Sequence, residues 1–94
     1  MTDRETDRAQ HQAMEAEASV LGAMLLERDA LARAVELLDQ TCFYLDSHRV
    51  IFSAIAALYD RGVVADSVTV TEELKKRKQL DKAGGASYLS MLLE

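Results

Sequence analysis

The most reactive side chains in the sequence belong to one cysteine, Cys42, and two histidines, His11 and His48. A thiol close to an imidazole can act as a nucleophile beside its general base. Cys42, however, stands next to Phe43 and Tyr44 in a short apolar segment, where a free thiol is usually buried and unreactive. We therefore predict an inert, buried cysteine and no catalytic pair.

The same residues have poor spacing for a metal site. A structural or catalytic zinc ion needs three or four ligands, and one cysteine with two distant histidines does not supply them. His11 falls in a polar segment, and His48 falls at the start of a predicted helix. We predict that His48 is a surface or partly buried helix residue, and we assign no metal ligand.

Two further patterns are also weak candidates for chemistry. Glu72 and Glu73 are adjacent acids, but neighbouring helix positions point in directions about 100° apart. A phosphate-binding loop needs several glycines followed by Lys and Ser or Thr. The glycines of this chain are Gly22, Gly62, Gly84 and Gly85, and none of them is followed by Lys-Ser or Lys-Thr. The sequence therefore predicts no catalytic residue and no cofactor-binding residue in this chain.

One strongly basic run, Lys75-Lys76-Arg77-Lys78, could contact phosphates. The alternative is a solvated helix end, where cations interact favourably with the helix dipole. The formal net charge of −5 and the absence of aromatic residues within the run favour the second interpretation. A small helical DNA-binding module that uses this run remains the alternative hypothesis for function.

The elements that carry these residues are predicted to be helical. The sequence has no proline and only four glycines, and apolar residues recur at helical spacing. We expect helices over residues 14–26, 29–39, 47–61 and 69–78, and a fifth from residue 86 onward. The helix over 47–61 is the most apolar, so it should be the centre of a compact all-α domain of about five helices.

Helix boundaries follow from capping residues. Asp29 and Asp46 are predicted N-caps, and Thr69 with Glu72 matches a capping box. Arg61 and Gly62 form a helix stop. The remaining glycines have simple structural interpretations: Gly22 allows close contact with a neighbouring helix, and the Gly84-Gly85 pair makes a turn.

The domain organisation is simple. Residues 1–13 are polar and aperiodic and predict a flexible tail, and residues 14–94 form one domain. A single cysteine and the lack of a signal peptide or a membrane-spanning stretch favour the cytoplasm. The apolar pattern is still running at the last residues, which suggests a piece of a longer protein. We expect an exposed surface for protein partners that includes Tyr88, Leu89, Met91, Leu92 and Leu93.

Several segments match one known family in order and spacing, and the resemblance covers about residues 14–93. They are EAEASVLGAMLL at 15–26, FY at 43–44, HRVIF at 48–52, LYDRG at 58–62, DSVTVTEEL at 66–74 and GGASYL at 84–89. The sequence resembles the N-terminal domain of bacterial replicative DNA helicases of the DnaB family. Residues 10–13 depart from the family's usual Pro and Asn before the first helix.

This resemblance implies a function by assembly. In that family the N-terminal domain is a helical, non-catalytic collar above a hexameric motor ring, contacts the same domain of a neighbouring subunit and helps to dock primase. It continues into a helical hairpin, which this chain lacks. The resemblance places ATP and Mg²⁺, and the contact with DNA, in a separate motor domain. It also implies a bacterial cytoplasmic protein at the replication fork.

Overall fold

The structure is a computed structural model that describes the backbone of residues 3–93 and the side chains of residues 8–93. The described part is all-helical, with five α-helices and one 3₁₀ helix, which confirms the predicted fold class. In chain order they are α1 (Asp3–Leu26), α2 (Arg28–Leu37), η1 (Gln40–Cys42), α3 (Asp46–Asp60), α4 (Ser67–Lys76) and α5 (Gly85–Leu92).

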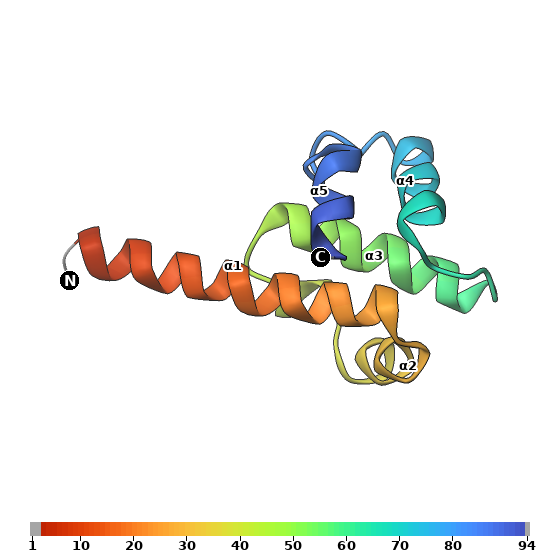
Figure 1. Cartoon of the computed structure of the whole chain (residues 1–94), viewed down its shortest axis with the longest axis horizontal. Helices are drawn as coiled ribbons and strands as arrows, with labels where there is room; N and C mark the ends of the chain where they lie inside the picture. The colour runs from red at the N-terminus through yellow and green to blue at the C-terminus, as the bar shows by residue number, and fades with distance from the viewer. Residues whose placement is uncertain (1–2, 94) are drawn as a thin grey trace.

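The helices are arranged around α1 and α3, as Figure 1 shows. The C-terminal half of α1 packs on α2, α3 and α5, while its N-terminal half extends away from the other helices. α4 and α5 pack against each other on the opposite side of the molecule from α2. The extended end of α1 gives the molecule dimensions of 45 × 26 × 24 Å.

The hydrophobic core is centred on α3, as predicted. Leu21 and Met24 of α1 and Leu74 of α4 pack into the same cluster, together with Phe43, whose ring centroid lies 5.1 Å from that of Phe52. α3 contributes six of the buried apolar residues, namely Val50, Ile51, Phe52, Ala54, Ile55 and Leu58. A helix that is apolar on most sides is packed on most sides, and α3 fits this rule.

The first helix begins earlier than predicted. α1 starts at Asp3, so the prediction of a start at Met14 is wrong, and residues 3–13 of the expected tail are helical. Residues 1–2 lie outside the described residues. The prediction relied on apolar periodicity, which residues 3–13 lack. Those residues contain no glycine or proline, and alanine, arginine, glutamate and glutamine are good helix formers.

The fourth helix has a different cap from the predicted one. α4 begins at Ser67 with Asp66 as its N-cap: the Thr69 amide donates to Oδ1 of Asp66 over 2.8 Å, and the Asp66 amide donates to Oγ1 of Thr69 over 2.9 Å. Thr69 is therefore the N3 residue of a capping box whose N-cap is Asp66. The predicted box, with Thr69 as the N-cap and Glu72 as its partner, is wrong. Glu72 instead forms an exposed ion pair with Lys75.

The other boundaries are closer to prediction. α2 begins at Arg28 with Glu27 at the N-cap position, so Asp29 lies in its first turn and is not its cap. α3 begins at Asp46 itself, so the prediction of Asp46 as its N-cap is also wrong. The predicted stop after α3 is confirmed, with Gly62 at φ 72°, and the predicted glycine turn is confirmed at Gly84, which has φ 100°.

A close helix contact explains Gly22, as predicted. Gly22 is buried on α1, and a methyl group at this position would meet the backbone carbonyl oxygen of Leu92 on α5. A backbone atom cannot move aside as a flexible side chain can. The glycine therefore allows α1 and α5 to approach closely.

Glu73 ties the end of α3 to α4. Its carboxylate is buried and accepts hydrogen bonds from Nη2 of Arg61 over 2.8 Å and from Nε of Arg77 over 2.9 Å. These hydrogen bonds outweigh the opposing effect of burial and lower the pKa of Glu73 from 4.5 to about 2. Glu73 therefore has a structural role.

We predict that Gly22→Ala destabilises the domain. Alanine favours a helix by about 1 kcal/mol, but overpacking against a rigid backbone costs about 1–3 kcal/mol, so the clash should decide the sign. Urea denaturation should show a lower free energy of unfolding for Gly22→Ala. Ser19→Ala, at an exposed position on the same helix, is the control and should change it by less than about 0.5 kcal/mol. A more stable Gly22→Ala variant would show that α5 can move away.

We also predict an acid-sensitive contribution from Glu73. Because its pKa is lower in the folded state, Glu73 stabilises the fold above about pH 4.5, and this stabilisation is lost as the pH falls toward 2. Glu73→Gln should therefore lower the melting temperature at pH 7 and flatten its decline between pH 4.5 and 2. Glu72→Gln, at the exposed neighbouring position, should leave both nearly unchanged. If the melting temperature of Glu73→Gln fell with pH as steeply as that of the unaltered chain, Glu73 would not be the source of the acid sensitivity.

Candidate functional site

Cys42 and His48 do not form a catalytic pair in the structure. Cys42 is exposed in η1, so the prediction of a buried thiol is wrong. The 3₁₀ turn directs the next residue, Phe43, into the core instead. His48 is fully buried, so the prediction of a surface or partly buried histidine is also wrong. Both ring nitrogens of His48 have hydrogen-bond partners other than Cys42, so it does not serve as the base for that thiol.

The described residues form neither a metal site nor a membrane-spanning helix. Among the residues whose side chains are described, no three His, Cys, Asp or Glu residues lie close enough together to hold a metal ion. His11 pairs with Glu15 one turn along α1, at 2.9 Å. None of the helices within residues 3–93 combines the length and apolar character needed to cross a bilayer.

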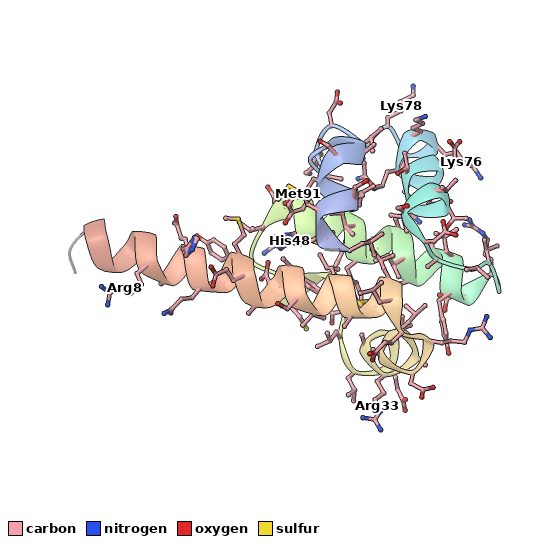
Figure 2. All side chains as sticks on the ribbon, in the orientation of Figure 1. Arg8, Arg33, His48, Lys76, Lys78 and Met91 are labelled. Carbon is pink, nitrogen blue, oxygen red and sulfur yellow. The ribbon has the colours of Figure 1, made fainter. Side chains whose placement is uncertain are left out.

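A hydrogen-bonded chain links three helices through the buried His48. Its Nδ1 lies 2.8 Å from Oε1 of Glu17 on α1, and its Nε2 lies 2.5 Å from the hydroxyl oxygen of Tyr88 on α5. In Figure 2, His48 lies between α1 and α5, and its side chain is fully buried. The rings of His48 and Tyr88 are also nearly parallel, with centroids 5.8 Å apart. We call these three residues the Glu17–His48–Tyr88 cluster.

Glu17 also binds the segment that leads into α3. Its carboxylate accepts a hydrogen bond from the amide of Tyr44 over 2.5 Å and a longer one from the amide of Leu45 over 3.4 Å. Tyr44 and Leu45 directly precede α3, so Glu17 holds the chain where it enters that helix. Burial raises the pKa of Glu17, but the hydrogen bonds from Tyr44, His48 and Leu45 together lower it below 4.5.

The Glu17–His48–Tyr88 cluster shares one feature with catalytic sites but is built as a structural contact. Perturbed titration often marks catalytic groups, and burial together with the negative charge of Glu17 raises the pKa of Tyr88. His48, however, is inaccessible, and every buried side-chain nitrogen and oxygen among the described residues has a hydrogen-bond partner. Both ring nitrogens of His48 are therefore engaged within the fold.

A shallow apolar groove lies beside this cluster, between α1 and α5. We call it the α1–α5 groove. Met14 and Met91 are its exposed apolar side chains, at 40% and 60% exposure, and Figure 2 shows Met91 on the outer side of α5. The groove is lined by His11, Met14, Glu15, Ala18, Ser19, Tyr88, Met91 and Leu92. Exposed methionines beside an apolar groove are typical of protein-binding surfaces.

The structure divides the predicted interface residues into two groups. Leu89 and Leu92 are buried in the chain's own core, at 0% and 8% exposure, so the expectation that they are exposed is wrong. Because α5 packs on both α1 and α4, its leucines are already covered. Tyr88 and Leu93 are half-buried, and Met91 is exposed. An interface on α5 can therefore use Met91 directly, with Tyr88 and Leu93 at its edges.

The basic run is exposed but partly neutralised. Arg77 donates to the buried Glu73 carboxylate over 2.9 Å, and Nζ of Lys75 lies 3.7 Å from Glu72. Lys75 and Lys76 occupy the last turn of α4, at the negative end of its dipole, which is the arrangement expected of a solvated helix end. Lys76 and Lys78 point outward in Figure 2.

We predict that Tyr88→Phe destabilises the fold through His48. Removing the hydroxyl group leaves the buried Nε2 atom without its partner, which should cost about 1–3 kcal/mol of unfolding free energy. Tyr59→Phe is the matched control at an exposed tyrosine and should cost less than about 0.5 kcal/mol. Chemical denaturation measures both variants. Equal losses would contradict a specific role for the Tyr88 hydroxyl group.

The comparisons with known proteins agree in one family. Residues 9–94 match the model described as the DnaB-like helicase N-terminal domain. The chain is 44% identical over 90 residues to the replicative DNA helicase DnaB of Leifsonia xyli subsp. xyli. It is 47% identical over 90 residues to the replicative DNA helicase DnaC of Bacillus subtilis. Each alignment covers 96% of this chain and 20% of the relative, so the chain spans about a fifth of these curated relatives.

A solved structure shows the same fold. The crystal structure of the N-terminal domain of DnaB helicase from Mycobacterium tuberculosis superposes with a TM-score of 0.82 at 48% sequence identity. The match covers 85% of this chain and 57% of that one. The family resemblance, the all-helical fold and the order of the helices are thereby confirmed. This chain belongs to the family of DnaB-like helicase N-terminal domains.

Proposed function

We propose that this chain is the non-catalytic collar domain of a bacterial replicative helicase, where it joins helicase subunits and docks primase. Membership of the DnaB-like N-terminal family supports this assignment. The observation that carries it is the α1–α5 groove, which presents apolar side chains from two helices on an otherwise acidic chain.

The composition of this groove suits a protein partner. Met14 and Met91 are unbranched and polarizable, so they can adapt to side chains of different shapes. Ala18 leaves room between them for an apolar anchor from the partner. At the rim, His11 and Glu15 pair with each other. Because the groove lacks a cluster of cations, it is better suited to a polypeptide than to a phosphate backbone.

The chemistry of the helicase is proposed to lie elsewhere in the protein. This chain spans about a fifth of its helicase relatives, and its described side chains include no cluster that could hold a metal ion. We assign ATP hydrolysis, the Mg²⁺ ion and movement along DNA to a motor domain in the same helicase. The location of this work is the bacterial cytoplasm, at the replication fork.

The DNA-binding alternative has a distinguishing test. The residues Lys75, Lys76, Arg77 and Lys78 would have to supply most of the phosphate contacts, although two of them already pair with acids. Binding to DNA through this run would weaken steeply with added salt and disappear when all four residues become Gln. Weak binding that does not change in that variant would favour the collar assignment.

We predict that Met91→Glu weakens partner binding at the α1–α5 groove. A charge at the centre of an apolar contact should lower the affinity for primase, or for a neighbouring subunit, about tenfold or more. Calorimetric titration with primase and analytical ultracentrifugation of the assembled helicase measure the two effects separately. Val68→Glu, an exposed apolar position on α4, is the control and should leave both unchanged. Unchanged affinity and assembly in Met91→Glu would contradict this use of the groove.

A further inference from the structure

Tyr88 belongs both to the α1–α5 groove and to the Glu17–His48–Tyr88 cluster. It lines the groove with Met91 and Leu92 of the same helix. Its hydroxyl oxygen lies 2.5 Å from Nε2 of the fully buried His48. Neither Glu17 nor His48 is among the described residues that line the groove. The cluster therefore reaches this surface through one side chain, that of Tyr88.

The Tyr88 side chain is held at its base and at its tip. A methyl group on Gly84 would lie 3.0 Å from Cβ of Tyr88 and 3.1 Å from its Cγ, so this glycine leaves room for the base of the side chain. At the tip, the ring lies nearly parallel to the imidazole of His48 and its hydroxyl group is hydrogen-bonded. A side chain that is already held in one orientation loses little entropy when a partner covers it.

The neighbours of His48 assign a role to each of its ring nitrogens. Burial opposes ionisation of Glu17, but its hydrogen bonds hold its pKa below 4.5, so at neutral pH the carboxylate only accepts hydrogen bonds. Nδ1 of His48 therefore carries a hydrogen and donates it to Glu17. Burial and the charge of Glu17 raise the pKa of Tyr88, so its hydroxyl group keeps its proton. In the neutral imidazole, Nε2 is then the acceptor for that proton.

We propose that His48 is a positioning residue for partner binding, because its Nε2 atom holds Tyr88 in the orientation that the α1–α5 groove presents to its partner. This inference rests on the proposed function of the groove. His48 does not touch the partner, since its side chain is fully buried. Without the hydrogen bond, the Tyr88 side chain gains freedom, and ordering it again opposes binding.

Two substitutions at His48 separate its two hydrogen bonds. The longer side chain of Gln can place its amide oxygen near the position of Nε2, whereas the amide of Asn reaches only the position of Nδ1. His48→Gln should keep the acceptor for Tyr88 and bind primase like the unaltered chain. His48→Asn should keep the donor to Glu17 but bind primase about threefold to tenfold more weakly. Calorimetric titration of the assembled helicase with primase measures both affinities.

Two further variants show whether a change in affinity comes from positioning or from lost stability. Tyr88→Phe removes the hydroxyl group and should weaken binding by a similar factor, and adding His48→Asn to it should weaken binding no further. Glu73→Gln also removes a buried polar contact, but Glu73 does not line the groove. It should lower the melting temperature and leave the affinity for primase unchanged. Circular dichroism checks that every variant is folded at the temperature of the titration.

The outcomes distinguish this inference from the proposed function. Affinities of His48→Asn and Tyr88→Phe equal to that of the unaltered chain would overturn the inference, as would His48→Gln binding as weakly as His48→Asn. Met91→Glu is measured in parallel. If Met91→Glu binds weakly while His48→Asn binds normally, the groove receives primase without the help of His48. If Met91→Glu also binds normally, the groove is not the primase site and both proposals are wrong.

Discussion

The hydrogen-bonded chain from Glu17 through His48 to Tyr88 holds together helices that are distant in sequence. Glu17 also binds the backbone just before α3, so one carboxylate holds both the entry to the central helix and the buried imidazole. Apolar packing supplies most of the driving force for folding but has little directionality. The polar chain adds direction, because its atoms are bonded in only one relative placement of α1, α3 and α5. The α1–α5 groove depends on that placement.

Glu73 performs a similar task at the other side of α3. Its two arginine partners directly follow the ends of α3 and α4, so Glu73 ties the C-terminal end of α3 to α4. The Asp66–Thr69 capping box completes this arrangement. Buried charges therefore define how the helices meet, while the aliphatic residues of α3 fill the space between them.

The sequence was sufficient to predict the fold class, the central helix and the helix stops, because these depend on local spacing and on glycine. It was not sufficient for contacts between segments. His48 was expected near the surface since its partners, Glu17 and Tyr88, are far away in sequence. A signal was nevertheless present: Glu17 is in helical register with the buried Leu21 and Met24, so its side chain had to point inward. The exposure of α5 was overestimated for a related reason, since the cover of Leu89 and Leu92 comes from other helices.

The close approach of Gly22 to Leu92 separates the fixed part of the α1–α5 groove from its adaptable part. The width of the groove is set by backbone against backbone, so rearrangement of side chains cannot widen or narrow it. Its outer edges are methionines, which have three rotatable bonds each and change shape at little cost. Such a surface would select partners by the thickness of the element that enters, and would tolerate differences in the side chains that the element carries.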